Sequence, residues 1–202
     1  MPKTDVSIHY DLLLAEGQDP VRDPAPLRAY MDKWDGKPFL DALQLSPEKT
    51  VLEIGVGTGR LAVRTAPFCK EFVGIDLSSD TVYRAAQNLL GFPKLKANVI
   101  CGDFLEYDFA QKFDVIYSSL TFMHIENKQA AIGKVASLLK KNGRFVLSID
   151  KNPSEYIDFG TRKLKIFPDT PEHIRSCIEH AGLTFTEQFE TEFAYIIAAQ
   201  SP

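Results

Sequence analysis

Cysteine, tryptophan and long apolar runs are all scarce in this chain. Its three cysteines, Cys69, Cys101 and Cys177, are far apart and odd in number, which fits a reducing compartment and excludes a disulfide framework or a Cys-x-x-Cys metal site. The first 17 residues hold only four consecutive apolar residues, Leu12 to Ala15, too few for a signal-peptide core or a membrane span. We therefore expect a soluble, cytoplasmic protein with no metal ion and no membrane partner.

An excess of positive charge is also missing. The 23 Lys and Arg residues are outnumbered by 27 Asp and Glu residues, which gives a net charge of −4. No basic stripe is available to neutralise a phosphate backbone, so we expect no nucleic-acid partner. The 45% apolar and 25% charged composition is that of an ordinary globular protein. A length of 202 residues suits one α/β domain that needs no disulfide or metal for stability.

The N-terminal quarter differs from the remainder of the chain. Residues 1–45 contain five of the twelve prolines and no β-type run, and they predict short helices at about 5–16, 26–33 and 37–45. We expect this stretch to be a helical lid on the main domain, residues 46–202. Its apolar side chains are too many to leave in water: Leu12, Leu13, Leu14, Leu27, Tyr30, Met31 and Trp34.

From Thr50 onward, apolar runs alternate with amphipathic segments. The runs at 51–54, 72–75, 97–100, 113–120 and 145–149 predict strands buried on both faces, as a parallel sheet requires. Helical spacing joins Val82 to Leu90, Ile132 to Leu139 (with Lys140 and Lys141 in the last turn) and Ile174 to Ala181. Two further strands, about 183–190 and 193–199, predict a hairpin. The pattern predicts an α/β fold: a doubly wound, mostly parallel seven-stranded sheet with a C-terminal antiparallel hairpin and helices on both faces.

A glycine-rich loop follows the first predicted strand, where such sheets bind ligands. Gly55, Gly57 and Gly59 alternate, and a glycine permits a tight turn and a close approach by a ligand. A phosphate-binding loop would need a Lys-Ser/Thr pair, which Arg60-Leu61 does not supply. The dinucleotide fingerprint would need its third glycine at Arg60.

The acid Glu53 precedes the three glycines, and the segment Val51-Leu52-Glu53-Ile54-Gly55-Val56-Gly57-Thr58-Gly59 resembles the first motif of class I S-adenosylmethionine-dependent methyltransferases. The resemblance covers roughly residues 48–150, and the stretch from Thr170 to Gln200 is similar in pattern only. It implies a Rossmann-like methyltransferase fold with S-adenosyl-L-methionine as cofactor and S-adenosyl-L-homocysteine as product.

The second and third strands each end in an acid. Asp76, with Leu77 after it, lies about 20 residues past the glycine loop, where a carboxylate accepts ribose hydroxyls; a helix-capping or turn role is the alternative. In similar proteins the acid at Asp103 accepts from the adenine amino group, although a plain turn role stays open. Phe104 either stacks on the ring or fills core.

The remaining candidates are also implied by the resemblance. Backbone carbonyls near Ser118 and Ser119 would face the ammonium of the cofactor, and Glu53 would reach the same group, through water. Tyr10 would cover its methionine end, as similar N-terminal tyrosines do. His124, in the loop after the fourth strand, is the candidate catalytic base or acceptor contact because its near-neutral pKa suits that task; a structural role is the alternative.

Three functions compete. The first is methyl transfer to a small-molecule acceptor by a monomer or homodimer, since no Asn-Pro-Pro-Tyr/Phe or Pro-Cys motif points to nucleic-acid bases or protein amides. The second is binding of S-adenosylmethionine or S-adenosylhomocysteine without transfer. The third, nicotinamide-dependent oxidation, is disfavoured by Arg60. Asp150, Lys151 and Tyr156 follow the fifth strand where substrates approach, and Phe159, Arg162 and Lys163 belong to an insertion that could form a substrate lid.

Overall fold

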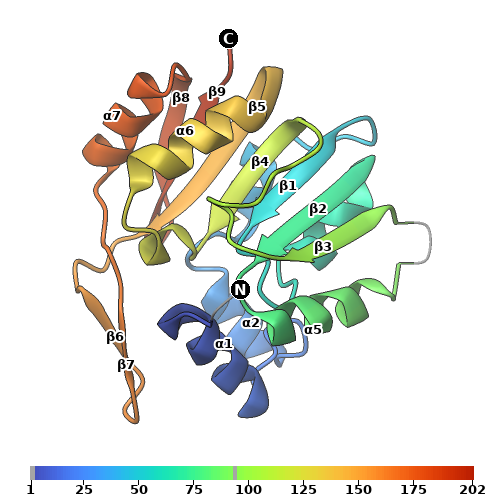
Figure 1. Cartoon of the computed structure of the whole chain (residues 1–202), viewed down its shortest axis with the longest axis vertical. Coiled ribbons are helices and arrows are strands. Elements are labelled where there is room, and N and C mark those ends of the chain that lie inside the picture. The colour runs from blue at the N-terminus through green and yellow to red at the C-terminus, as the bar shows by residue number, and fades with distance from the viewer. Residues whose placement is uncertain (1–2, 93–94) are drawn as a thin grey trace.

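One sheet of seven strands organises the computed structural model, which describes residues 3–92 and 95–202 (Figure 1). The strand order is β3–β2–β1–β4–β5–β9–β8. The first five strands in this order run parallel, whereas β9 is antiparallel to both of its neighbours. In chain order the strands are β1 (Thr50–Ile54), β2 (Glu71–Asp76), β3 (Ala97–Cys101), β4 (Phe113–Ser119), β5 (Leu139–Asp150), β8 (Thr184–Glu190) and β9 (Ala194–Gln200).

Helices cover both faces of this sheet, so the predicted doubly wound fold is confirmed. One apolar cluster joins the sheet to α6 and α7, and a second joins its other face to α3, α4 and α5. The helical elements are α1 (Asp5–Ala15), α2 (Ala25–Met31), α3 (Gly36–Ala42), α4 (Ala62–Thr65), η1 (Ala66–Phe68), α5 (Ser79–Leu89), η2 (Phe122–His124), α6 (Lys128–Leu138) and α7 (Pro171–His180).

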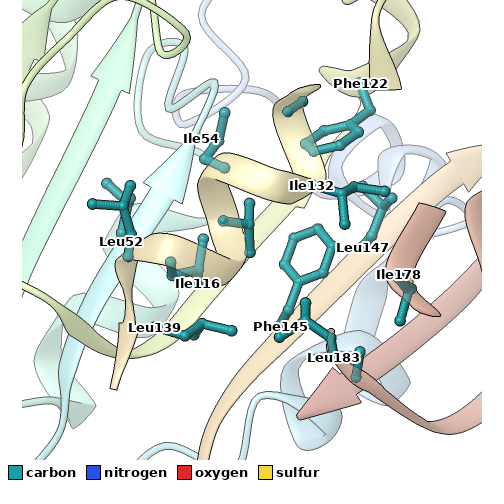
Figure 2. Close-up of a cluster of buried hydrophobic side chains, with 14 of the residues drawn as sticks. Leu52, Ile54, Ile116, Phe122, Ile132, Leu139, Phe145, Leu147, Ile178 and Leu183 are labelled. Atoms are coloured by element: carbon teal, nitrogen blue, oxygen red, sulfur yellow. The ribbon is translucent and has the colours of Figure 1, made fainter. Parts of the chain in front are cut away.

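The core under α6 explains why the apolar runs became buried strands. In Figure 2, Ile132 of α6 lies among side chains of β4 and β5, including Ile116, Phe145 and Leu147. These four side chains are fully buried. Burying a large apolar side chain is worth roughly 1.5–3 kcal/mol, so this interface stabilises the centre of the sheet. The carboxyl ends of β1, β2 and β4 are thereby held on a rigid base.

Two details of the sheet differ from the sequence prediction. β3 is not buried on both faces, because it lies at the sheet edge and its side chains are exposed or half-buried. Lys140 and Lys141 do not extend the preceding helix, since α6 ends at Leu138 and β5 begins at Leu139. The ammonium of Lys140 instead lies 2.7 Å from Asp114 Oδ2, so the ion pair draws this residue to the amino end of β4.

A short hairpin lies outside the main sheet, within the insertion expected after the fifth strand. Its strands β6 (Tyr156–Asp158) and β7 (Lys163–Lys165) are antiparallel. Figure 1 shows the hairpin projecting from the end of the molecule where α1 lies, and β7 contacts α1. The position of the hairpin agrees with a lid role for the insertion.

The N-terminal residues form three helices close to the predicted ranges, but they bury less apolar surface than expected. Leu12, Leu27 and Tyr30 are 43%, 44% and 46% exposed. Leu13, Leu14, Met31 and Trp34 are half-buried. Polar contacts to the main domain, described below, supplement apolar burial in holding this stretch.

Candidate functional site

The glycine loop leaves β1 and turns sharply at the carboxyl end of the sheet. The backbone N–H groups of Gly55 and Val56 both donate to the carbonyl of Ile75, at 2.8 and 3.1 Å, and so tie the loop to β2. A Cβ on Gly55 would overlap the side chain of Thr121, at 1.9 Å from Oγ1. Gly57 has a positive φ of 52°, and a Cβ there would meet no atom within 4 Å. Gly57 thus borders open space that a ligand can enter.

Asp76 lies at the end of β2, directly beside this open space. Its Oδ2 accepts a hydrogen bond from the Gly57 backbone at 2.8 Å, and its Oδ1 accepts from Ser78 N at 3.0 Å. Burial raises the pKa of Asp76, although these hydrogen bonds act in the opposite direction. Capping of α5 falls to Ser78, whose hydroxyl accepts from Thr81 N. The carboxylate therefore shapes the glycine loop while still facing the site, and Leu77 follows it in the turn.

Glu53 lies deeper than the sequence suggests. It is 3% exposed, and its Oε2 accepts a hydrogen bond from the Tyr117 hydroxyl at 2.8 Å. That hydroxyl also contacts Thr65 Oγ1 at 2.8 Å. Burial raises the pKa of Glu53 to about 8, against the opposing effects of the Tyr117 hydrogen bond and of Arg60. Glu53 therefore lies in a buried polar cluster beneath the glycine loop, and any contact with a ligand would require water between them.

The raised pKa of Glu53 makes a testable contribution to stability. The unfolded chain ionises this group near its ordinary pKa of 4.5, whereas the folded protein keeps it protonated up to about pH 8. Ionisation thus favours the unfolded state increasingly between about pH 4.5 and 8. We expect the free energy of unfolding of the wild type, relative to Glu53→Gln, to fall across this range in urea titrations. Glu71→Gln is the control, because a hydrogen bond from Lys96 lowers the pKa of Glu71; equal slopes for wild type and Glu53→Gln would contradict the assignment.

The two serines that end β4 have structural partners. Ser118 Oγ donates to the Ile54 carbonyl at 2.9 Å, and Ser119 Oγ donates to Asp35 Oδ2 at 2.8 Å. Asp35 is fully buried and forms an ion pair with Arg60, whose Nη1 lies 3.0 Å from Asp35 Oδ1. Burial alone would raise the pKa of Asp35, but Arg60 holds it below its usual range. Sequence reasoning missed Asp35, and it considered Arg60 only as a failed match to other glycine loops.

Asp103 and Phe104, neighbours in the turn after β3, lie in different environments. Asp103 Oδ1 accepts from Leu105 N at 2.8 Å, which is the hydrogen bond of a turn residue. Phe104 is 5% exposed and belongs to the core cluster beside Phe109. The structure therefore favours the core alternative for Phe104 over a stacking role. Asp103 remains half-buried at the carboxyl end of the sheet, where its adenine contact stays a prediction.

Tyr10 and His124, 114 residues apart, meet over the site. The Tyr10 hydroxyl lies 2.8 Å from His124 Nε2, and burial raises the Tyr10 pKa, with the charge of Asp76 adding to the effect. Burial lowers the pKa of His124 to about 4, so the near-neutral pKa expected from the sequence is wrong for this conformation. Nδ1 of His124 is buried without a hydrogen-bond partner in the described part of the chain. Such an atom is costly to leave unpaired and marks the place where a ligand could bind.

Polar contacts hold the middle and the C-terminal end of helix α1. Asp11 Oδ1 accepts a hydrogen bond from Ser78 at 2.5 Å, next to Asp76. At its C-terminal end, Arg162 of the hairpin loop binds both carboxylate oxygens of Glu16 at 2.7 and 3.0 Å, and its Nε lies 3.0 Å from His9 Nδ1. Exposed ion pairs contribute little free energy. This helix is therefore attached by bonds that can open.

We expect amide hydrogen exchange across residues 7–20 to slow when S-adenosylhomocysteine is added. A lid must open locally to admit a ligand, and a bound ligand adds contacts only to the closed form. Mass spectrometry of exchange with and without the ligand measures the effect, and β4 and β5 serve as internal controls because they should change far less. If the exchange rate of residues 7–20 did not change with the ligand, α1 would be a fixed structural element and Tyr10 would not belong to the site.

Within residues 3–92 and 95–202, no group of three or more His, Cys, Asp or Glu side chains could hold a metal ion. In the same part of the chain, no helix is long and apolar enough to cross a membrane.

Comparison with known proteins supplies the family. The profile described as "Methyltransferase domain" matches residues 45–195. The chain therefore belongs to the methyltransferase-domain family, as its motifs predicted. An uncharacterized methyltransferase of Schizosaccharomyces pombe is 30% identical over 159 residues, which cover 68% of this chain and 54% of that protein. The chain spans about half the length of the curated relatives it matches.

Solved structures confirm the fold. Magnesium protoporphyrin IX methyltransferase from Synechocystis, crystallised with bound S-adenosylmethionine, is 16% identical and superposes with a TM-score of 0.74. The match covers 98% of this chain and 98% of that protein. The 4+2 cyclase SpnF is also 16% identical, with a TM-score of 0.76 and coverage of 98% of this chain and 95% of its own. At such identities the likeness concerns the fold alone, and one fold evidently serves different reactions.

Proposed function

We propose that this protein binds S-adenosyl-L-methionine and transfers its methyl group to a small-molecule acceptor. The observation that carries the proposal is the pairing of Gly57 with Asp76. The carboxylate is bonded to the loop backbone at 2.8 Å, and the space in front of Gly57 is open. A ligand there meets exposed backbone on one side and a carboxylate on the other. This is the arrangement that a ribose-bearing ligand needs.

The residues around this space fit the cofactor. Asp76 accepts two backbone hydrogen bonds and a longer one, at 3.4 Å, from the Thr81 hydroxyl. With about four acceptor positions on a carboxylate, it would still accept from the ribose beside Leu77. Asp103 would accept from the adenine amino group. Carbonyls at Ser118 and Ser119 would face the ammonium of the cofactor, and Glu53 would reach the same ammonium through water. The unpaired Nδ1 of His124 and the adjacent Tyr10 would close the methionine end.

The bound cofactor supplies a methyl group already activated on a sulfonium, so the work of the protein is alignment and exclusion of water. Tyr10 and His124, whose contact joins α1 to η2, would provide that cover. With its pKa near 4, His124 is neutral at physiological pH and can accept a proton, but it is a weak base. We therefore assign His124 to closing and orienting the site. A proton-accepting role would require a different environment in the loaded enzyme.

Turnover tests the proposal. Formation of S-adenosylhomocysteine over a panel of amine, hydroxyl and thiol acceptors, with calorimetric binding of S-adenosylmethionine, should reveal both affinity and transfer. Binding without product would support the alternative, a ligand-binding protein of the same fold. A saturable NADH titration with no binding of S-adenosylmethionine would overturn both and favour an oxidoreductase.

The proposal also includes the domain organisation, the location and the partners of the protein. Residues 1–45 would act as the lid segment of the domain formed by residues 46–202, a division supported by the family match from residue 45. The lack of a basic stripe in the sequence argues against a nucleic-acid acceptor. We propose a cytoplasmic location, a small-molecule partner, and a monomer or homodimer as the working state.

A further inference from the structure

Arg162, in the loop of the β6–β7 hairpin, contacts helix α1 with all three of its side-chain nitrogen atoms. Nη1 and Nη2 lie 2.7 and 3.0 Å from the two carboxylate oxygens of Glu16, and Nε donates to His9 Nδ1 at 3.0 Å. The ring of Phe159, in the same loop, packs on the ring of His9 with centroids 4.2 Å apart. Because His9 is only 3% exposed, the bond that it accepts is shielded from water in a way that a surface ion pair is not.

This contact determines the protonation state of His9. The N–H groups of a guanidinium donate hydrogen bonds and accept none, so Nδ1 of His9 must carry no proton for the bond to form. The proton of the neutral ring is then on Nε2. Burial and the charge of Arg162 lower the pKa of His9, against the opposing charge of Glu16. The neutral ring that Arg162 requires is therefore the form present at physiological pH.

The hairpin is itself attached to the segment that carries His124. Directly after β7, the backbone N–H of Phe167 donates to the Met123 carbonyl at 2.7 Å. The buried ammonium of Lys128 donates to the carbonyls of Phe167 and Ile125, at 2.9 and 2.7 Å. Met123 and Ile125 are the two chain neighbours of His124. The hairpin and η2 therefore form one frame, with His124 at one end and Arg162 at the other.

Helix α1 is attached to this frame at two points. Tyr10 lies 2.8 Å from His124, and His9, one residue earlier, is bonded to Arg162. The rings of His9 and His124 both pack edge-on against the Tyr10 ring. Each has one buried nitrogen, His9 Nε2 and His124 Nδ1, without a hydrogen-bond partner in residues 3–92 and 95–202. Because buried unpaired polar atoms are costly, other contacts must hold α1 in this position, and Arg162 supplies three.

We propose that Arg162 is a positioning residue of the proposed methyltransferase: its bonds to His9 and Glu16 hold α1 closed, and so bring Tyr10 onto His124. Arg162 touches neither the cofactor nor the acceptor and acts only through α1. The inference rests on the proposed function, because a closed α1 serves methyl transfer only if a cofactor binds beneath it. The closure itself is a property of the free protein and is measured there.

The tautomer of His9 tests the central bond without the use of any variant. Nitrogen-15 NMR of the full chain at neutral pH should show the ring proton of His9 on Nε2 and an unprotonated Nδ1. A proton on Nδ1 would exclude a hydrogen bond from Arg162 to that atom and would overturn the proposal.

The pKa of His124 reports the position of α1 in the free protein. Burial lowers this pKa to about 4, and an open α1 would return it toward the ordinary value of 6.5. In an NMR titration, His124 of Arg162→Met should therefore titrate at least about one pH unit higher than in the wild type. The charges that act on His124 are those of His9 and Lys128, so this rise reports movement of α1 rather than loss of the Arg162 charge. The histidines of α7 serve as internal references.

Lys163→Met is the matched control for this titration. It removes the adjacent cation of the same hairpin, which pairs with the exposed Asp158, and should leave the titration of His124 unchanged. Arg162→Lys keeps the positive charge but lacks the fork that reaches two partners, so it should shift His124 in the same direction as Arg162→Met. An unchanged His124 titration in both Arg162 variants would overturn the proposal.

Calorimetry with S-adenosylhomocysteine separates this inference from the proposed function. Arg162→Met should bind the ligand about three- to tenfold more weakly, a loss between that of an exposed ion pair and that of a buried charged hydrogen bond. Lys163→Met should bind as the wild type does. Equal binding by all three proteins would refute the role of Arg162 alone. No binding by any of them, with His124 still shifted in Arg162→Met, would refute the proposed function and confirm only that Arg162 holds α1 closed.

Discussion

Replacing Gly57 with valine is expected to abolish binding of S-adenosylhomocysteine and S-adenosylmethionine while the fold persists. No protein atom lies within 4 Å of the position of a Cβ on Gly57, so the new side chain has room in the free protein. On the proposed function, that room is the space the ligand would occupy. The positive φ of 52° adds a strain of roughly 1–3 kcal/mol for a residue other than glycine, which should lower the melting temperature without unfolding the chain.

A matched variant separates strain from obstruction. Gly182, which follows α7, has a φ of 76° and also has open space around its Cβ position. Gly182→Val should therefore carry a comparable backbone penalty but bind the ligand as the wild type does. Calorimetry and circular dichroism on both variants decide the question. Unchanged ligand affinity in Gly57→Val, with an unchanged spectrum, would show that the glycine loop does not border the cofactor.

Replacing Asp76 with alanine is expected to weaken cofactor binding by about 1.5–3 kcal/mol, or about 10- to 150-fold, the usual loss for hydrogen bonds to a charged group. The structure adds a second cause for the loss. Asp76 Oδ2 holds the Gly57 backbone at 2.8 Å, so alanine also releases the loop that the ligand must meet. Calorimetric titration with S-adenosylhomocysteine measures the sum of the two effects.

Two further variants apportion this loss. Asp76→Asn retains one carbonyl oxygen for the loop and should recover part of the affinity. Asp80→Ala removes an exposed acid from the first turn of α5 and controls for the change of net charge. An Asp76→Ala protein that bound as tightly as the wild type would refute the ribose assignment.

The sequence predicted those parts of the site that are local along the chain. Gly55, Gly57 and Asp76 belong to two strand ends, and strand ends of a parallel sheet must lie together. The buried ion pair of Asp35 with Arg60 was not predicted, because 25 residues separate its members and Asp35 stands among polar residues without a motif. Tyr10 and His124 were each proposed, yet their 2.8 Å contact depends on where α1 packs, which is against α5 and β7.

The local sequence pattern also gave wrong predictions where contacts between distant segments determine the structure. The apolar run at 97–100 predicted a strand buried on both faces, but the strand order places β3 at the sheet edge. Lys140 fits a helix terminus by its charge, but the carboxylate of Asp114 and the hydroxyl of Thr50 attract it to the sheet. Neither contact has a signal in the neighbouring residues.

Trp34 and Asp35, adjacent in the chain, join the N-terminal helices to two strand ends of the sheet. Trp34 Nε1 donates to Asp150 at the end of β5, whereas Asp35 accepts from Ser119 at the end of β4 and binds Arg60 after the glycine loop. One peptide unit therefore holds the ends of β4 and β5 and the glycine loop to the same N-terminal segment. A ligand that moved this segment at the glycine loop would shift the end of β5 as well, and any such coupling has to be reciprocal.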